Sequence, residues 1–158
     1  MLFDHVSPAA LDVTGTHELT NREEKPMKEV VLRDLFERYI AALNSHDFEH
    51  LSEFMHDDMI VNGQPMTREQ MVTVLEGHVE AVPDLIWRPQ DLAIDGDRVA
   101  ARFFNKGTPV KEWLGSPPSG ATVEYVEHVF HKIRDGRFIE QNFLLDALAI
   151  QQQLNACR

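Results

Sequence analysis

The sequence predicts a single α+β domain in which N-terminal helices pack on one face of an antiparallel sheet. Apolar residues follow a helical period through residues 31–43, and a second such segment follows a helix-capping sequence at residues 67–70. Further along, Asp95-Gly96 and Asp135-Gly136 each lie between apolar segments, and each predicts a β-hairpin. Helices followed by hairpins are typical of the α+β class. The 158 residues, 43% of them hydrophobic and 26% charged, fit one globular domain.

The folded domain is expected to span residues 28–157. Residues 1–27 contain prolines, a glycine and charged residues without a sustained period, so we expect a flexible extension with at most one short ordered piece. From Lys28 onward, apolar residues recur at intervals of four and mark one face of a helix. They are Val31, Leu35, Tyr39 and Leu43, with Leu32, Phe36 and Ile40 beside them. A second, short helix fits residues 47–55, with Ser45 or Asp47 as its cap.

The third helix is expected after a short apolar run that ends at Val61. Thr67 and Gln70 have the spacing of a capping box, in which each side chain satisfies a backbone amide of the other. The helix ends before Pro83, because a proline disfavours helical geometry in the residue that precedes it. Its apolar face consists of Met71, Val74, Leu75, His78 and Val79.

The remaining chain is expected to form the sheet and a final helix. One strand alternates through Val99, Ala101 and Phe103. In the other strand, one parity is expected to face inward and consists of Val123, Tyr125, Glu127, Val129, His131 and Ile133. Residues 115–120 must form a loop, since two adjacent prolines cannot donate to a ladder. The last helix is expected to begin at Asp146, a good N-cap.

Composition excludes several classes of protein. A formal net charge of −11 disfavours phosphate backbones and anionic lipid surfaces, so neither a nucleic acid nor a membrane is expected as a partner. The single cysteine, Cys157, cannot form an intrachain disulfide. The N-terminus lacks the basic and apolar regions of a signal peptide, and the sequence contains no stretch long enough for a membrane span. We therefore expect a cytoplasmic protein.

Short motifs distributed over residues 28–155 resemble those of the SnoaL-like polyketide cyclases, a family within the nuclear-transport-factor-2-like superfamily. The matching pieces are the segments at residues 39–47, 82–85, 96–100, 113–120, 135–140 and 146–154. The resemblance implies a cone-shaped, strongly curved antiparallel sheet packed on the helices, with a ligand pocket in the cone. It also implies pairing into a homodimer, or a dimer of dimers, through the outer face of the sheet.

The last strand departs from the family pattern. In the cyclases, the residue equivalent to Glu140 is normally followed by a His, a Trp and often an Asp, and that Asp is a candidate acid/base. Here the three positions are Gln141, Asn142 and Phe143. Because Phe143 cannot transfer a proton, any acid/base chemistry must use another residue.

Two carboxylates are candidate catalytic residues. Glu127 lies on the inward parity of its strand, where desolvation would raise its pKa toward a value suited to proton transfer. It could instead belong to a buried structural pair. Asp146 could act with Glu127 as an acid/base pair if it reached the pocket. The alternative role for Asp146 is to cap the last helix.

Seven further residues are candidates for ligand binding. Asn62 and Gln141 could orient the ligand or hold an oxyanion, although Asn62-Gly63 is also a favoured turn dipeptide. His78 could be a general base or a neutral core histidine. The other four are expected at the core or the rim of the pocket, and they are Tyr39, Trp113, Tyr125 and Phe143.

Neither a metal nor an organic cofactor is expected. His46 and His50 are four residues apart but lack a third ligand, and His128 and His131 point to opposite faces of a strand. The sequence therefore favours a pocket protein for a mostly apolar metabolite that performs cofactor-free cyclisation, isomerisation or dehydration. The alternative is a non-catalytic ligand-binding or dimerisation module that has lost the catalytic acid of the family.

Overall fold

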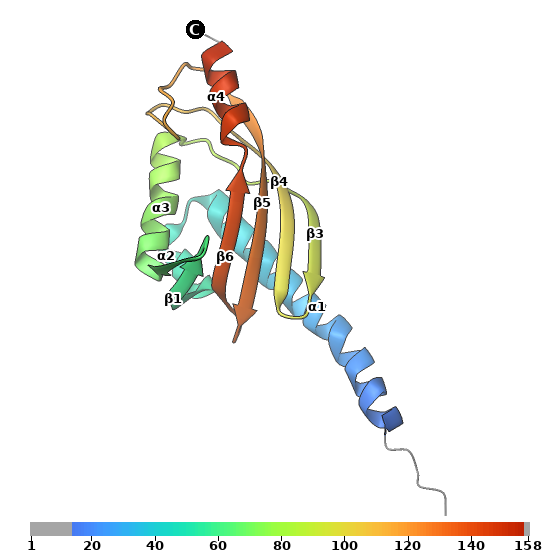
Figure 1. The fold of residues 1–158 in the computed structure, drawn as a ribbon. Coiled ribbons are helices and arrows are strands. Elements are labelled where there is room, and N and C mark those ends of the chain that lie inside the picture. Colours follow the sequence, from blue (N-terminus) through green and yellow to red (C-terminus); the bar gives the residue numbers. More distant parts are fainter. Residues whose placement is uncertain (1–13, 157–158) are drawn as a thin grey trace, which may run out of the picture.

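The protein forms one curved layer of sheet, with the N-terminal helices packed on its concave face and the last helix at one end (Figure 1). The computed structural model describes the backbone of residues 14–156 and the side chains of residues 28–156. The helices are α1 (Thr14–Ser45), α2 (Phe48–Leu51), α3 (Arg68–Ala81) and α4 (Ala147–Ala156), with a 3-10 turn at Ser52–Phe54. The strands are β1 (Met55–Val61), β2 (Gln64–Thr67), β3 (Pro89–Asp95), β4 (Arg98–Gly107), β5 (Val123–Arg134) and β6 (Arg137–Leu145).

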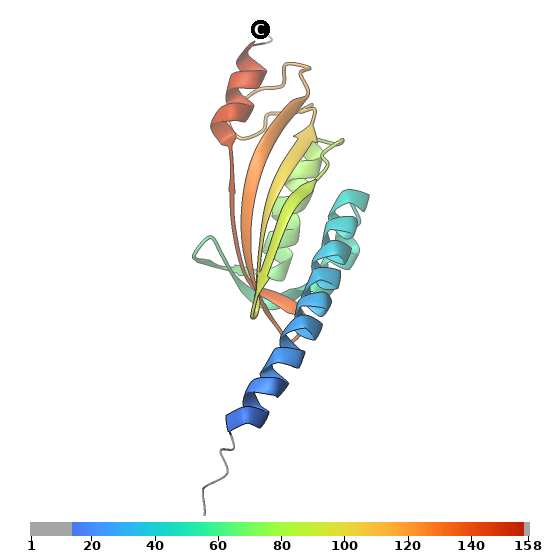
Figure 2. The same cartoon turned by 90° about the vertical axis from the view of Figure 1, so that its right-hand side faces the viewer.

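Helix α1 is longer than the sequence pattern indicates. It begins at Thr14 rather than at Lys28 and continues through Pro26. Residues 14–27 lack an amphipathic period but contain several good helix formers, including Glu, Lys and Arg, which favour a helix by their intrinsic propensity. The first turns of α1 project beyond the sheet (Figure 2).

The expected buried face of α1 is confirmed except at Val31. Val31 is 60% exposed, whereas Leu32, Phe36 and Ile40 are buried together with Leu35, Tyr39 and Leu43. A strict interval of four residues advances by about 40° per step around a helix of 3.6 residues per turn, so Val31 is rotated about 120° away from Leu43. The face with mixed intervals of three and four residues is the one that packs on the sheet.

The sheet has six strands in the order β2-β1-β6-β5-β4-β3 and is curved but not closed. Four of the neighbouring pairs are antiparallel, whereas β1 and β6 are parallel. The expectation of a purely antiparallel sheet is therefore wrong at this pair. Its cause is the long path through α3 and the two hairpins, which brings β6 back beside β1 in the same direction.

Both predicted hairpins are confirmed. Arg134 pairs with Arg137 around a two-residue turn, in which Asp135 and Gly136 have φ values of 51° and 71°. These positive values match the right-handed twist of the flanking strands. In the other hairpin Asp95 pairs with Arg98, so the turn residues are Gly96 and Asp97.

The caps predicted from the sequence are present at α3 and α4. Thr67 and Gln70 form the reciprocal capping box at the start of α3. Asp146 caps α4, because its Oδ1 accepts a hydrogen bond of 2.9 Å from the Ala149 amide. The short helix at residues 47–55 is confirmed only up to the 3-10 turn, since Met55 begins β1.

Removal of residues 1–24 is expected to leave the midpoint of thermal unfolding nearly unchanged. Among the residues whose side chains the structure describes, α1 contributes buried side chains from Leu32 onward, and the truncation leaves all of these in place. Removal of residues 1–36 is the control, and we expect it to abolish cooperative unfolding because it takes Leu32, Leu35 and Phe36 from the core. Calorimetry of the two truncated chains measures both effects. A large loss of stability after the shorter truncation would identify the extension as a structural arm.

Candidate functional site

A cavity lies between the concave face of the sheet and helices α1 and α3. It encloses about 610 Å³, counting the part that opens to solvent. Its walls come from three directions: Tyr39 and Leu43 of α1, Met71, Leu75 and His78 of α3, and the inward side chains of β4, β5 and β6. Most of these residues are apolar or aromatic, so the cavity suits a ligand with a mostly apolar body.

Glu127 projects into this cavity from the middle of β5. Its side chain is only 8% exposed, and the alternation of β5 places it on the buried face between Tyr125 and Val129. Burial raises the pKa of Glu127 to about 7, because the apolar surroundings penalise the charged carboxylate. Glu127 can therefore gain and lose a proton close to neutral pH.

Asn105 is the hydrogen-bond partner of this carboxyl group. Its Nδ2 donates to Glu127 Oε2 across 2.6 Å, and this hydrogen bond lowers the pKa of Glu127 against the larger effect of burial. The Asn105 side chain is fully buried, and its Oδ1 accepts from the Arg88 amide at 3.1 Å. Because its oxygen is engaged by the backbone, the amide group must present its NH₂ to Glu127.

Sequence reasoning missed Asn105, although a signal for it was present. The residue continues the inward parity of Val99, Ala101 and Phe103 along β4, and β4 pairs with β5. An amide at an inward position, beside a strand that carries an inward carboxylate, could have identified the pair.

His131 is a second polar residue of the cavity that the candidate site residues did not include. It lies on the same face of β5 as Glu127 and is 4% exposed. Its ring packs against Tyr39, Phe36 and Phe138. Burial lowers the pKa of His131 to about 3, so the imidazole is neutral at physiological pH. The parity of β5 indicated its burial but not its position beside the ligand cavity.

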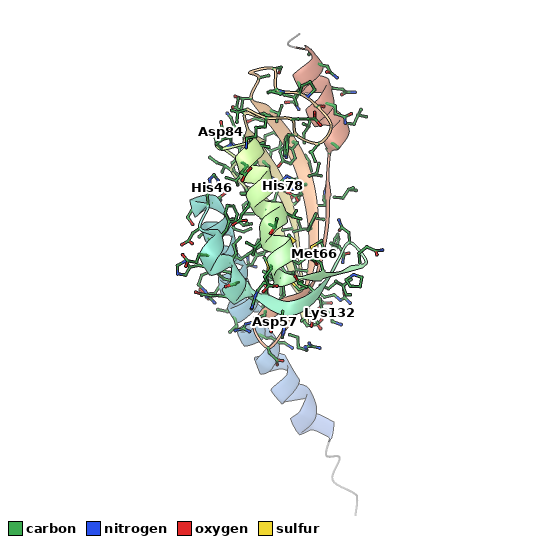
Figure 3. The ribbon with its side chains drawn as sticks, turned by 90° about the vertical axis from the view of Figure 1, so that its left-hand side faces the viewer. His46, Asp57, Met66, His78, Asp84 and Lys132 are labelled. Carbon is green, nitrogen blue, oxygen red and sulfur yellow. The ribbon has the colours of Figure 1, made fainter. Side chains whose placement is uncertain are left out.

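His78 joins α3 to the loop between β4 and β5. The Trp113 indole Nε1 donates to His78 Nδ1 across 2.9 Å, and both residues line the cavity. Figure 3 shows His78 on α3. Burial lowers the pKa of His78, so the ring stays neutral and carries its proton on Nε2. The hydrogen bond holds Trp113 against α3 at the wall of the cavity.

Six of the nine predicted site residues line the cavity: Tyr39, His78, Trp113, Tyr125, Glu127 and Phe143. Gln141 is fully buried next to it, and its Nε2 donates to the Tyr39 hydroxyl at 3.4 Å. Asn62 has a turn conformation with φ of 47°, and its Oδ1 accepts from the Phe143 amide. Asp146 caps α4 and lies outside the cavity wall. Asn62 and Asp146 therefore have the structural roles that were the alternatives to ligand contact.

Between residues 28 and 156, the structure contains no group of three or more His, Cys, Asp or Glu side chains that could hold a metal ion. His50 pairs instead with Asp47, and His46 bonds to the Leu85 carbonyl oxygen at 3.0 Å.

Comparison with protein families supplies the identification. The family model of the SnoaL-like polyketide cyclases matches residues 33–154. The chain belongs to the SnoaL-like polyketide cyclase family. Members of this family bind small-molecule ligands, which agrees with the mostly apolar cavity of this chain. No curated protein matches the chain significantly.

Solved structures of the SnoaL-like family share the fold. A SnoaL-like polyketide cyclase from Agrobacterium tumefaciens is 31% identical, with a TM-score of 0.73, and the match covers 78% of this chain and 97% of that one. IdmH, a candidate polyketide cyclase from Streptomyces antibioticus, is 29% identical, with a TM-score of 0.71 and coverage of 78% and 97%. TsrD from Streptomyces laurentii is 28% identical, with a TM-score of 0.73 and coverage of 80% and 96%.

Within the described part of this family member, no helix is both long and apolar enough to span a membrane.

Replacement Glu127→Gln is expected to stabilise the protein in a pH-dependent way. The folded state binds the Glu127 proton more tightly than the unfolded state, so wild-type stability falls as the pH rises from about 4.5 to about 7. This difference in pKa corresponds to about 3 kcal/mol of unfolding free energy. A Gln at position 127 carries no charge and avoids most of this loss, and its side-chain oxygen can still accept the hydrogen bond from Asn105. Denaturant unfolding at pH 5 and pH 8 measures the difference.

Glu124→Gln is the matched control for this comparison. Glu124 lies on the opposite face of β5, where it pairs with Arg88 and Lys106 at the surface. Surface pairs contribute about 0–1 kcal/mol, so this variant should show no comparable gain at pH 8. If Glu127→Gln strongly destabilises the protein at both pH values, Glu127 is one half of a structural pair.

Proposed function

We propose that this SnoaL-like protein is a cofactor-free acid/base enzyme that cyclises, isomerises or dehydrates a mostly apolar metabolite, with Glu127 as the general base. The observation that carries the proposal is the position of the Glu127 carboxyl group, which lies in an apolar cavity with the Asn105 amide as its hydrogen-bond partner. Each of the three reactions can begin with removal of a proton from a carbon next to a carbonyl group. The resulting carbanion is stabilised as an enolate.

The surroundings of Glu127 support this role in two ways. Its raised pKa makes the carboxylate a stronger base than an exposed glutamate, yet leaves a large fraction ionised at neutral pH. The hydrogen bond from Asn105 fixes the carboxyl group, because Asn105 is itself held by the Arg88 backbone amide. We assign Asn105 as a positioning residue that acts through Glu127. Asp146 has no part in the proposed proton transfer, since it lies outside the cavity wall.

The competing function is ligand binding without catalysis. Phe143 occupies the position at which the family often has an acid, and it lines the cavity as an apolar wall. Glu127 lies one strand away, opposite Leu145 in the ladder between β5 and β6, whereas Phe143 is opposite Val129. The proposal therefore requires a base on β5, at Glu127, instead of a base at the usual position of the family on β6.

Deuterium exchange at a model ketone tests the catalytic proposal. We expect the protein to accelerate exchange of the α-protons of 2-tetralone, an apolar bicyclic ketone, in D₂O. The rate should rise with pH through about 7, as Glu127 loses its proton. Glu127→Gln should lower the rate by at least about 10²-fold, the usual contribution of a general base. Proton NMR measures the exchange.

Asn105→Ala and Glu124→Gln complete this experiment. Loss of the Asn105 hydrogen bond should raise the midpoint of the pH profile, because that bond favours the carboxylate. Glu124→Gln should leave both rate and midpoint unchanged, since Glu124 lies on the outer face of the sheet. Binding of 2-tetralone without any accelerated exchange would support the non-catalytic alternative.

We further propose that the protein forms a homodimer through the outer face of the sheet. Large apolar side chains are exposed on this face and at the adjoining α4: Phe104 is 39%, Phe130 60%, Leu144 76% and Leu148 63% exposed. Phe104, Phe130 and Leu144 come from the three neighbouring strands β4, β5 and β6. Such a patch is typical of an interaction surface, and a two-fold arrangement covers it with a second copy of itself.

Sedimentation tests the assembly. We expect the wild-type protein at micromolar concentration to sediment with at least twice the monomer mass of 18.1 kDa. The double variant Phe130→Lys, Leu144→Lys should sediment as a monomer with an unchanged fold, because both side chains are exposed in the isolated chain. A wild-type protein that sediments at 18 kDa would contradict the proposed dimer.

A further inference from the structure

The segment between β4 and β5, residues 108–122, closes part of the cavity with the side chain of Trp113. Figure 1 shows the segment beside α4, at the end of α3. Trp113 is 4% exposed and lines the cavity, and its ring packs against Tyr125 with 5.6 Å between the ring centroids. It also meets the ring of His78 edge-on. A displacement of Trp113 would therefore widen the cavity.

Trp113 belongs to a tight turn that two helices hold in place. Its backbone N–H and C=O groups pair with those of Ser116 across 2.9 and 3.0 Å, and the two residues between them have φ values of 51° and 75°. Trp113 Nε1 donates to His78 Nδ1 of α3 at 2.9 Å. Gln151 of α4 donates to the Leu114 carbonyl oxygen at the longer distance of 3.3 Å. The bond to His78 is thus the shorter of these two links.

His78 lies on the side where the cavity opens to solvent. It is half-buried, and Val74, which lines the cavity one turn earlier on α3, is 39% exposed. On the opposite side, Phe143 and Leu145 of β6 also line the cavity and are partly exposed. The opening therefore lies between α3 and β6, and the His78 ring can exchange a proton with solvent there.

The hydrogen bond between Trp113 and His78 exists in only one protonation state of the imidazole. An indole N–H is a donor and never an acceptor, so His78 Nδ1 must present its lone pair. Protonation of the ring places a hydrogen on this nitrogen, and two N–H groups then face each other. The positive charge would also lie against a largely apolar wall. Protonation of His78 therefore opposes the observed position of Trp113.

We propose that His78 is a positioning residue that holds Trp113 as a closing wall of the cavity and releases it on protonation, so that ligand exchange accelerates as the pH falls. The proposal rests on the proposed role of the cavity as a ligand pocket, but not on catalysis by Glu127. Because the closed arrangement requires a neutral ring, protons shift the population toward the released turn. Burial lowers the pKa of His78 from about 6.5, so the release belongs to the range below that pH.

The elements around His78 carry other ionisable groups: Tyr39 of α1, Tyr125, Glu127 and His131 of β5, Lys111 and Glu112 before Trp113, and Glu76 and Glu80 of α3. Burial raises the pKa of both tyrosines, so they keep their protons, and it lowers the pKa of His131 to about 3. Lys111 pairs with Glu80 at the surface. Glu127, with a pKa of about 7, titrates next to the range of His78. Its contribution is removed by measuring every variant in a Glu127→Gln background.

Dissociation of N-phenyl-1-naphthylamine, an apolar fluorescent probe that stays uncharged between pH 5 and pH 8, measures ligand exchange by stopped flow. In the Glu127→Gln protein, we expect the dissociation rate to rise about tenfold from pH 8 to pH 5, the effect of losing one hydrogen bond. The wild-type protein should show the same rise below pH 6. A rate that is equal at pH 8 and pH 5 would overturn the proposal.

His78→Asn is the matched control, because its Oδ1 is as many bonds from Cα as Nδ1 of histidine and accepts from the indole at every pH. This variant should keep the slow rate at both pH values. His78→Leu offers no acceptor and should be fast at both. In a Trp113→Phe background, which has no donor, the Asn and Leu variants should dissociate equally fast. A tenfold rise that persists in His78→Asn would assign the pH dependence to another group and overturn the proposal.

NMR of the ligand-free wild-type protein gives a readout that requires no probe. The chain has two tryptophans, so it gives two indole N–H signals, and Trp87→Phe assigns them. The Trp113 signal should shift as the pH falls, with the same midpoint as the His78 ring. A Trp113 signal that stays constant while His78 titrates would overturn the proposal. A wild-type protein that binds no probe contradicts the ligand-pocket function and the control of exchange together, whereas a bound probe with a pH-independent rate overturns only the control of exchange.

Discussion

The register of β5 is the constraint on which the fold and the site both depend. Every second side chain from Val123 to Ile133 is buried, and Glu127 and His131 share that parity with the apolar residues. A slip of one residue would move the whole set to the outer face of the sheet. The two-residue turn at Asp135-Gly136 fixes the pairing with β6, and the ladder with β4 brings Glu127 opposite Phe103.

Burial in the same cavity shifts the pKa of its carboxyl group and the pKa values of its histidines in opposite directions. Desolvation penalises the charged form of every group, so it raises the pKa of Glu127 and lowers that of His131 and His78. His131 consequently stays neutral over the range in which Glu127 titrates. The same apolar walls therefore favour the neutral form of the carboxyl group and of both imidazoles.

This chain keeps the fold of the SnoaL-like family with an apolar side chain at position 143. Phe143 lines the cavity here, and the curved sheet is retained with structures of 28–31% identity. A polar group in this cavity requires only an inward position on a strand and a partner on a neighbouring strand. Glu127 and Asn105 meet this requirement on β5 and β4, which pair antiparallel. A scaffold of this kind can therefore carry polar groups at different inward positions of the sheet.

The sequence by itself determined the features that depend on local geometry. Alternation in β5 predicted the burial of Glu127, the Asp-Gly dipeptides predicted the hairpins, and the capping box predicted the start of α3. Tertiary structure decided which distant segments meet, because such contacts leave no periodic signal along one segment. It placed Asn105 against Glu127, directed Asn62 and Asp146 to structural hydrogen bonds, paired β1 with β6 in parallel, and brought His131 beside Tyr39.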